Sequence, residues 1–290
     1  MAEAKGKRAI VVTGASTGIG RACVAHAVAQ GAHVFAAVRK QADAESLAQD
    51  FGDRVTPLIM DVTDEAQIAA AVAKVSDWLA GRTLFGLVNN AGIAVPGPLA
   101  HLATDDVRRQ FETNLFGLHA VTSAFLPLLG ADRARQGAPG RIVMISSVGG
   151  TEGAPFVGAY AASKHAVEGY SKSLRRELML YGVEVVVVAP GAVATPIWDK
   201  AETSGLERFD NTPYGPAARR VAAYMLELGR KGLPAAAIAR VVWRGLTRPK
   251  PPFRITILRN KFADYTLPRL LPGRFVNGLI AKRLGLTTRP

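Results

Sequence analysis

Short apolar runs alternate along the chain with longer stretches in which apolar residues recur at helical spacing. The runs occupy residues 8–13, 33–38, 55–60, 84–89, 141–146 and 183–189. Each run is rich in Val, Ile or Leu and shows little polar alternation, which is typical of strands buried on both faces of a parallel sheet. The helical spacing is clearest at residues 20–30, 64–80, 105–129 and 158–181. This alternation predicts a Rossmann-type, doubly wound α/β fold with a parallel sheet.

Residues at the ends of two stretches support the helix predictions. Asp64 can cap the amino end of one helix with its carboxylate, and Gly182 stands where another helix would end in a left-handed residue. Later in the chain the pattern weakens, and residues 196–233 show helical patches without a clean period. We expect a further helix over residues 234–246, opened by a proline, and a last strand over residues 253–258.

The composition excludes several classes of protein. With 290 residues and 49% hydrophobic composition, the chain can bury one large core. It has no apolar run of about eighteen residues, and its polar first residues lack the core of a secretory signal. The single cysteine, Cys23, allows no internal disulfide, and the five histidines lack the spacing of metal ligands. We therefore expect a cytoplasmic location and no metal, with a peripheral membrane contact as an alternative location.

The positive charge is distributed unevenly. The net charge is +13, and residues 240–290 hold twelve Lys or Arg against one acid, Asp264. We expect a dinucleotide-binding catalytic domain at residues 1–258, whose residues 196–233 form a substrate lid. Residues 259–290 would then be a basic amphipathic C-terminal extension.

The predicted extension has two interpretations. Phe275, Val276, Leu279 and Ile280 fall on one side of a helix, although Arg283 falls within that side. The segment could pack over the substrate pocket or a dimer partner, which is the commoner use of an amphipathic stretch. It could instead lie on an anionic membrane as a peripheral anchor.

A glycine-rich segment joins the first predicted strand to the first predicted helix. It reads Thr13-Gly14-Ala15-Ser16-Thr17-Gly18-Ile19-Gly20. Glycines allow the backbone to approach a pyrophosphate, and the helix that follows offers free N–H groups to the phosphates. The same letters match the G-x-S-x-G elbow of α/β hydrolases, with Ser16 as nucleophile and three histidines downstream. That alternative lacks room for the strands and oxyanion loop that should precede the elbow.

Four further motifs follow in order, and together they resemble the classical short-chain dehydrogenase/reductase family over residues 8–196. They are Asn89-Asn90-Ala91-Gly92 after the fourth strand, Asn114 in Asn114-Leu115-Phe116-Gly117, Ser147 with Tyr160 and Lys164, and Pro190-Gly191 followed by Thr195. Within that family the chain looks most similar to hydroxysteroid and retinol dehydrogenases. The resemblance implies hydride transfer between a nicotinamide and a secondary alcohol or ketone.

The resemblance assigns the chemistry to four residues. Tyr160 and Lys164 lie four apart in a helical pattern, so they project from one face, and a nearby ammonium favours the phenolate form of tyrosine. Tyr160 is the implied acid/base, and Lys164 would lower its pKa and bind the nicotinamide ribose. Ser147 would orient the substrate oxygen, and Asn114 would hold a proton-relay water. The substrate-binding residues expected are Ser147, Tyr160 and Trp198.

The resemblance also implies a dinucleotide site and a choice of nucleotide. Its expected residues are Gly14, Ser16, Thr17, Gly18, Ile19, Gly20, Arg39, Asp61, Val62, Asn89, Ala91, Gly92, Tyr160, Lys164, Pro190, Gly191, Val193 and Thr195. Val38 stands where an NAD enzyme carries an acid, and Arg39 after it can meet a 2′-phosphate. Asp61 would bond the adenine amine, or else cap the helix near Asp64. We therefore expect NADP(H) rather than NAD.

Partners and competing functions complete the expectations. Large apolar residues between Ile197 and Leu226 suggest a bulky hydrophobic substrate. The helices at 105–129 and 158–181 have family counterparts that pair across a two-fold axis, so we expect a homodimer or homotetramer. The alternative is a non-catalytic dinucleotide-binding protein with a membrane- or nucleic-acid-binding tail. That class would normally have lost a catalytic residue, and we do not expect nucleic acid as a partner.

Overall fold

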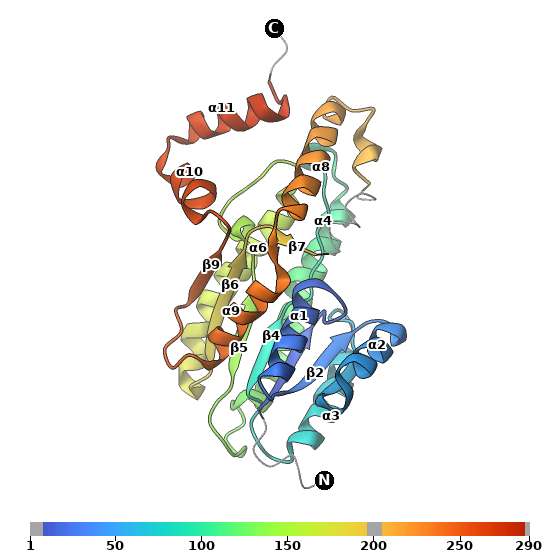
Figure 1. The fold of residues 1–290 in the computed structure, drawn as a ribbon, viewed down its shortest axis with the longest axis vertical. Coiled ribbons are helices and arrows are strands. Elements are labelled where there is room, and N and C mark those ends of the chain that lie inside the picture. Colours follow the sequence, from blue (N-terminus) through green and yellow to red (C-terminus); the bar gives the residue numbers. More distant parts are fainter. Residues whose placement is uncertain (1–7, 196–204, 288–290) are drawn as a thin grey trace.

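A computed structural model describes residues 8–195 and 205–287, and at its centre lies a seven-stranded parallel sheet (Figure 1). The strand order is β3-β2-β1-β4-β5-β6-β9. The strands are β1 Ala9–Thr13, β2 His33–Val38, β3 Val55–Ile59, β4 Gly86–Asn89, β5 Arg141–Ile145, β6 Glu184–Pro190 and β9 Arg254–Ile257. The order reverses between β1 and β4, and doubly wound folds bind their ligands at such a switch point. The Rossmann-type single-domain fold expected from the sequence is thus confirmed.

Helices cover both faces of the sheet. Helices α3 (Glu65–Leu79), α5 (Leu118–Phe125) and α6 (Gly158–Glu177) pack on one face. Helices α1 (Gly18–Ala29), α2 (Gln41–Phe51) and α9 (Ala235–Thr247) pack on the other. Toward the carboxyl edge of the sheet lie α4 (Thr104–Phe111), α8 (Gly215–Arg230), α10 (Leu267–Leu270) and α11 (Gly273–Leu284) (Figure 1).

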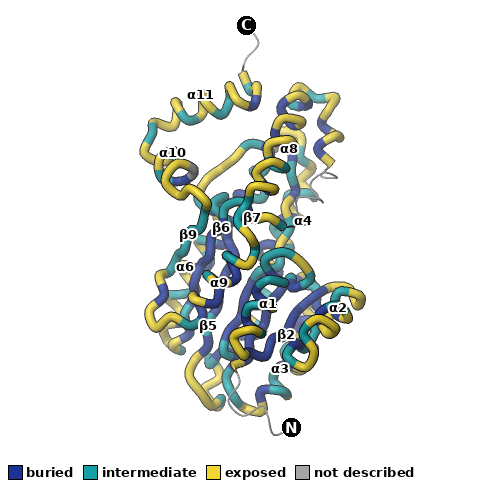
Figure 2. Tube along the Cα trace, viewed as in Figure 1, coloured by how far each residue is buried: buried dark blue, intermediate teal, exposed yellow. Residues whose placement is uncertain are grey.

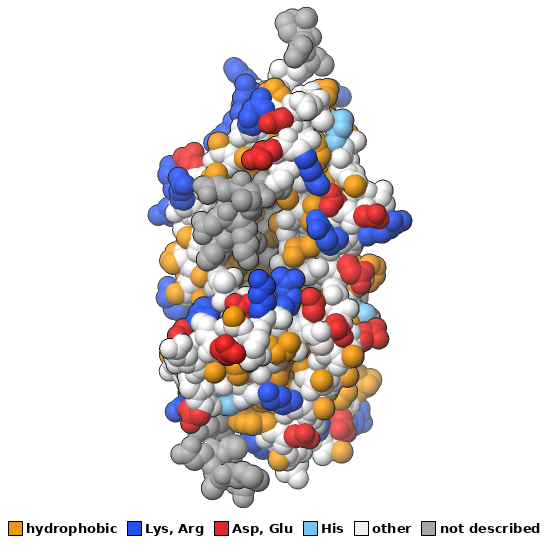
Figure 3. All heavy atoms as spheres, turned by 90° about the vertical axis from the view of Figure 1, so that its right-hand side faces the viewer, with side chains coloured by type: hydrophobic (Ala, Val, Ile, Leu, Met, Phe, Trp, Pro, Cys, Tyr) orange, Lys and Arg blue, Asp and Glu red, His pale blue; other side chains and the backbone are white. Residues whose placement is uncertain are grey.

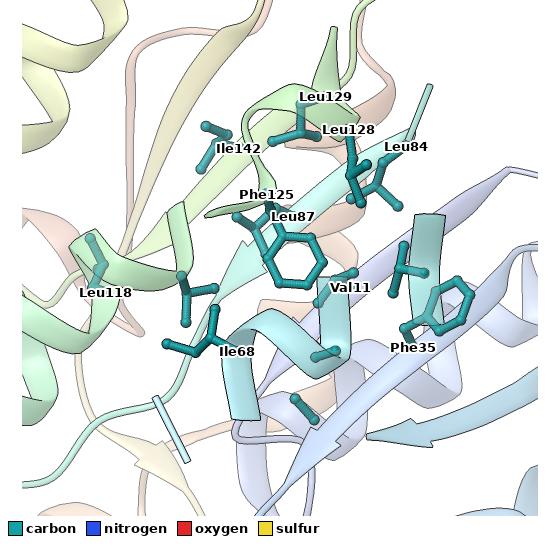
Figure 4. Close-up of a cluster of buried hydrophobic side chains, with 14 of the residues drawn as sticks. Val11, Phe35, Ile68, Leu84, Leu87, Leu118, Phe125, Leu128, Leu129 and Ile142 are labelled. Atoms are coloured by element: carbon teal, nitrogen blue, oxygen red, sulfur yellow. The ribbon is translucent and has the colours of Figure 1, made fainter. Parts of the chain in front are cut away.

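Each face of the sheet has its own core. Val11 and Phe35 point to the face of α3 and α5, where Phe125 and Leu87 join them (Figure 4). Their strand neighbours, such as Val12, point to the opposite core. Because both faces of β1 are buried, the strand has no polar position before Thr13, which explains its continuous apolar run.

The long helix expected over residues 105–129 is interrupted. Between α4 and α5 the chain makes a π-helical turn, Glu112–Gly117. Two buried amides lie beside this turn. Gln110 bonds the main chain of Val95, and Asn114 bonds that of Ile93. These hydrogen bonds hold the helix against the loop after β4. The helical spacing of apolar residues could not predict the π turn, because it contains no information on polar contacts.

Other expectations are confirmed locally or missed for a clear reason. Asp64 caps α3 by accepting a hydrogen bond from the Gln67 N–H at 3.0 Å, and Gly182 is left-handed with φ 69°. The expected last strand is β9, and the expected helix over residues 234–246 is α9. Helix α2 was not predicted, because it buries only Ala44 and Leu47 and its apolar face is narrow.

The residues after β9 pack partly on α8. The chain forms a π-helical turn, Phe262–Thr266, and then α10 and α11. Leu284 of α11 joins a small apolar cluster with Phe156 and with Val221 of α8. Much of α10 and α11 is nevertheless exposed (Figure 2). Among the residues that the structure describes, no helix has both the length and the apolarity needed to cross a membrane.

Candidate active site

The glycine loop lies at the switch point, against the loop that follows β4. A Cβ on Gly20 would approach the carbonyl oxygen of Gly14 to 2.1 Å, so only glycine allows this turn to close onto α1. A Cβ on Gly18 would lie 3.2 Å from the Cβ of Thr195, which places the segment after β6 directly beside the loop. Residues far apart in the sequence therefore meet around one strand–turn–helix unit.

Thr13 and Asn90 fasten the two loops together. The Thr13 hydroxyl accepts hydrogen bonds from the main-chain N–H groups of Asn90 and Ala91, each at 2.9 Å. The Asn90 amide in turn donates to the carbonyl oxygens of Thr13 and Gly14, at 2.9 and 3.0 Å. Both residues stand within the quoted motifs, but neither was expected as a site residue. Their side chains position the loops.

The amino end of α1 fits a diphosphate. Thr17, at its N-cap, makes no side-chain capping bond, and the first turn of the helix carries no acid. The first N–H groups of the helix and its positive dipole end are thus unopposed by an anion of the chain. Ser16 and Thr17 of the loop lie partly or fully exposed beside them. This arrangement can accept the phosphates of a dinucleotide.

The residues after β2 and β3 form a small charged corner. The side chain of Arg39 is 69% exposed, and its guanidinium lies 3.9 Å from the carboxylate of Asp61. Asp61 accepts hydrogen bonds from the main chain and hydroxyl of Thr63, so it shapes a turn, while Asp64 serves as the helix cap. Val38 is buried and apolar at the position before Arg39.

Two expected cofactor residues point into the core. The Asn89 side chain is buried and donates to the Thr122 hydroxyl at 2.8 Å and to the Met144 sulfur at 3.3 Å. Val62 is buried under the π-helical turn, where a Cβ on Gly117 would lie 2.8 Å from it. Either residue could therefore meet a cofactor only through its main chain.

The segment after β6 completes the rim of the site. Pro190 ends β6, and the Gly191 N–H donates to the Ile257 carbonyl at 2.9 Å. Val193 lies in a short strand, β7 (Val193–Ala194), which pairs with β8 (Leu233–Pro234). Trp198, the expected substrate contact, lies outside the described residues, as does Ile197.

Ser147, Tyr160 and Lys164 come together where β5 ends and α6 begins. The Ser147 side chain lies beside the Tyr160 ring, since a Cβ on Gly149 would lie 3.5 Å from the Ser147 hydroxyl oxygen and 3.7 Å from a carbon of that ring. The Lys164 ammonium lies 5.8 Å from the centre of the Tyr160 ring and donates to the Ile145 carbonyl at 2.8 Å. Lys164 is buried, with 5% of its surface exposed. The structure therefore assembles the triad expected from the sequence spacing.

Burial sets the direction of both ionisations. The pKa of Lys164 falls from 10.5 to about 8 because burial penalises the ammonium, and the carboxylate of Glu168 opposes this fall. Burial raises the pKa of Tyr160 above 10.0, and the hydrogen bond from Ser147 opposes the rise. We expected Lys164 to lower this tyrosine pKa. In the structure its ammonium binds a carbonyl oxygen instead, and the effect of burial prevails.

Asn114 links three parts of the site. Its side-chain oxygen accepts from the Ile93 N–H at 2.9 Å, and its amide nitrogen donates to the Ile93 carbonyl and to the Ser163 hydroxyl, at 3.1 and 3.0 Å. A Cβ on Gly92 would lie 3.1 Å from the Asn114 oxygen and 3.8 Å from the Lys164 ammonium nitrogen. Both amide hydrogens are used, so only oxygen lone pairs are left for a water.

A polar network behind Ser147 was not predicted. Arg254 of β9 binds both oxygens of Glu168, at 3.0 and 3.1 Å, and donates to the Tyr265 hydroxyl at 3.1 Å and the Ser147 carbonyl at 3.4 Å. Ser146 donates to Glu168 at 2.7 Å. The network joins the C-terminal segment to the loop that carries Ser147. Its members are scattered singly through the sequence, where no motif could reveal them.

The described residues of the stretch expected to form a lid make two kinds of contact. Tyr214 packs edge-on against Phe156, and Met225 packs on the same apolar cluster. Tyr224 is exposed and lies under the Arg283 guanidinium, 4.5 Å from its ring centre. A separate groove of about 600 Å³ lies between α6 and α11, lined by residues such as Ala162. It follows a different face of α6 from Tyr160 and Lys164, so it is not the reaction site.

Histidines do not surround the loop serine of the rival hydrolase prediction. His165 bonds the Ala161 carbonyl, His119 bonds the Tyr170 hydroxyl, and His101 packs against the Tyr214 ring. Within the described residues, no group of three or more His, Cys, Asp or Glu side chains is arranged to hold a metal. None of these three histidines therefore serves as the acid–base partner that Ser16 would need as a nucleophile.

Comparison with known proteins agrees with this geometry. A sequence model of the short chain dehydrogenase family matches residues 8–204. An NADPH-dependent 3-dehydrocapnine reductase from Ornithobacterium rhinotracheale is 36% identical over 282 residues, covering 97% of this chain and 99% of that protein. The 17-beta-hydroxysteroid dehydrogenase type 6 of Homo sapiens is 40% identical over 201 residues, covering 69% and 61%. A solved short-chain dehydrogenase from Streptomyces avermitilis superposes over 100% of both chains, with a TM-score of 0.75 at 27% identity.

The burial of Lys164 predicts a measurable cost in stability. The pKa of Lys164 is about 8 in the folded chain and 10.5 in the unfolded chain, so the folded chain binds this proton less tightly. Below pH 8 the lysine is charged in both states, and its burial then destabilises the folded state. The penalty is fully present there and is relieved as pH rises toward 10.5. We expect Lys164→Met to raise the free energy of unfolding at pH 7 by up to roughly 3 kcal/mol. Urea denaturation of both proteins at pH 7 and pH 9.5 checks this.

The difference between variant and wild type should narrow as the pH rises. Lys172→Met is the matched control, because Lys172 lies on the same helix and is exposed. Its effect should be small at both pH values. A Lys164→Met difference that does not change with pH would show that the ammonium is not penalised by burial.

Proposed function

Because the chain belongs to the short chain dehydrogenase family of oxidoreductases, we propose that it transfers a hydride between NADP(H) and a secondary alcohol or ketone. One observation carries this proposal. Ser147, Tyr160 and Lys164 meet at the carboxyl edge of the sheet, beside a glycine loop whose helix end is free to bind phosphates. A protein that only binds a dinucleotide would have no need of a buried lysine next to a tyrosine and a serine.

The chain's own residues would handle the proton. In the direction of reduction, Tyr160 donates its phenolic proton to the substrate oxygen, and the Ser147 hydroxyl holds that oxygen in place. The positive charge of Lys164 reduces the cost of the phenolate that forms, against the effect of burial. The bound nicotinamide dinucleotide supplies the hydride. We also assign to Lys164 a hydrogen bond with the nicotinamide ribose.

Asn114 positions the segments that carry these residues. Its amide holds the loop after β4 and the α6 helix together through Ile93 and Ser163. We assign to it the relay water that returns protons to Lys164. Because both amide hydrogens are occupied, that water would bind an oxygen of Asn114.

The corner after β2 favours the phosphorylated nucleotide. A carboxylate at position 38 would bond the ribose 2′-hydroxyl of NAD and repel a 2′-phosphate. The apolar Val38 does neither. Arg39 is exposed, and the carboxylate of Asp61 lies 3.9 Å from its guanidinium. The relative from Ornithobacterium rhinotracheale, which spans the same length, is named as NADPH-dependent. The dinucleotide contacts we propose are those of the glycine loop, Arg39, Asp61 and the rim from Pro190 to Thr195.

The substrate we propose is bulky and apolar. The apolar cluster of Phe156, Val221 and Leu284 lies between α8 and α11, beyond the carboxyl edge of the sheet. Tyr214 and Met225 add large apolar surfaces to it. A hydroxysteroid, named in one relative, is an alcohol of this kind. We also propose that residues 1–258 form the catalytic unit, that residues 196–233 close over the substrate, and that the protein assembles as a homodimer or homotetramer.

Removing one hydroxyl tests the assignment of the proton donor. We expect Tyr160→Phe to lower kcat/KM for a bulky apolar ketone by roughly three powers of ten, because the phenol no longer supplies a proton. NADPH affinity, measured by protein fluorescence quenching, should change little. Tyr170→Phe is the matched control on the same helix, where the hydroxyl bonds His119 at 3.1 Å, away from Ser147 and Lys164. Turnover by Tyr160→Phe close to that of Tyr170→Phe would reject Tyr160 as the donor.

Reversing one charge tests the choice of nucleotide. Arg39→Asp should lower kcat/KM with NADPH by about ten- to a hundred-fold, because it replaces a charge-assisted contact with repulsion. The value with NADH should stay the same or rise. Lys40→Asp controls for a general loss of positive charge at the same exposed corner. If the wild-type protein already prefers NADH, or both variants lose equally, the proposal for NADP(H) fails.

A further inference from the structure

Exposed apolar side chains concentrate in the C-terminal segment. Among the described residues, five of the twelve exposed large hydrophobic side chains lie between positions 262 and 279. They are Phe262, Leu267, Leu270, Phe275 and Leu279, with Leu270 as much as 73% exposed. Scattered apolar residues on a surface need no explanation, but a cluster within one short segment marks a surface of interaction.

Helix α11 presents apolar residues on two sides. Ile280 and Leu284 face α8 and join the cluster of Phe156 and Val221. Phe275 and Leu279 are four apart, about 100° or more around the helix from Leu284, and both are more than half exposed. Packing on the protein therefore explains one side of α11 and leaves the other unexplained.

The same segment carries cations that have no partner among the described residues. Residues 259–287 contain six Lys or Arg and one acid, Asp264. Three of these cations have partners: Arg269 pairs with Glu152, Arg283 covers Tyr224, and Arg259 bonds the Lys231 carbonyl. The side chains of the other three make no ion pair or hydrogen bond with any described residue. They are Lys261, Arg274 and Lys282.

We infer that residues 259–287 form a surface that rests on an anionic lipid bilayer. Phe262, Leu270, Phe275 and Leu279 would enter the boundary between head groups and acyl chains, while the unpaired cations meet lipid phosphates. This combination of exposed apolar and cationic side chains is that of helices lying in a membrane interface. The segment lies at the same end of the molecule as the carboxyl edge of the sheet (Figure 1), so the bilayer would adjoin the reaction site.

Two other occupants fit the observations less well. A nucleic acid would match the cations but would leave Leu267, Leu270 and Leu279 in water. A second copy would pair this surface with itself across a two-fold axis, and that would bring like charges together. Figure 3, which shows the side of the molecule away from α10 and α11, has Lys and Arg side chains at the end near the C-terminus with Asp and Glu side chains among them. Only an anionic, partly apolar partner satisfies both kinds of side chain.

Vesicle flotation of the full-length chain tests the inference. At low salt, the protein should float with vesicles of phosphatidylcholine and phosphatidylglycerol, and much less with phosphatidylcholine alone. Leu279→Ser should weaken binding roughly ten-fold, because it removes an apolar side chain from the interface. Leu180→Ser is the matched control, since Leu180 is 66% exposed on the turn after α6 and should leave binding unchanged.

A second pair of variants tests the charges. Arg274→Gln with Lys282→Gln should weaken binding to anionic vesicles by roughly ten-fold or more, since each cation near such a surface adds about five-fold to the affinity. The control is Arg133→Gln with Lys172→Gln, two exposed cations elsewhere. All variants should keep the melting temperature and the turnover of a water-soluble ketone, which separates lost binding from lost folding.

Three results would overturn the inference. The first is no flotation of the wild-type chain with anionic vesicles at low salt. The second is equal loss of binding in Leu279→Ser and Leu180→Ser. The third is evidence for another partner when the wild-type chain does not bind vesicles. That evidence would be a lower molecular mass of Leu279→Ser than of the wild type in light scattering, which indicates an interface between copies, or a gel shift of the wild type with DNA. None of these outcomes depends on whether the chain reduces ketones.

Discussion

A positive charge buried where β5 meets α6 is the constraint on which the rest of the site depends. Lys164 has almost no contact with water, and burial lowers its pKa to about 8. The Ile145 carbonyl accepts one of its hydrogens, and the carboxylate of Glu168, one helical turn later, stabilises the charge from a distance. A buried charge of this kind destabilises the folded state, which indicates that the residue is kept for a function and not for stability. It can support a phenolate on Tyr160 because the protein holds both side chains on one face of a rigid helix.

The polar contacts around Lys164 explain why distant segments meet there. Asn114 lies in a π turn that interrupts the helix and bonds Ile93 and Ser163, and a Cβ on Gly92 would meet both its oxygen and the Lys164 ammonium. Thr13 and Asn90 lock the loop after β4 to the glycine loop. The glycine loop and the residues proposed to transfer the proton are therefore joined by hydrogen bonds. Glu168 connects this unit to Arg254, and through it to the C-terminal segment that the catalytic motifs do not include.

The fold and the centre of the site could be predicted from the sequence because their signals are local. Buried parallel strands are continuous apolar runs, and Tyr160 and Lys164 share a face by spacing alone. The π turn at Asn114 and the network of Arg254, Glu168 and Tyr265 could not, because a hydrogen bond between distant residues leaves no periodic trace. The direction of the Tyr160 pKa was also missed, since burial is a property of the folded chain. Helix α8 was not predicted as a single element; its buried residues Ala217, Ala218 and Val221 pack against Phe156 and Leu284, which are distant in the sequence.

The central claim is that this buried lysine and its tyrosine serve a direct hydride exchange, and isotope transfer tests it most directly. A bulky apolar ketone is incubated with NADPH deuterated on the transferring face of carbon 4, and the alcohol is analysed by mass spectrometry. One deuterium on the former carbonyl carbon, together with an exchangeable solvent proton on its oxygen, is the predicted result. Two results would contradict it. The first is an alcohol that contains no deuterium, whichever face of carbon 4 carries the label. The second is that no ketone tried is reduced to an alcohol.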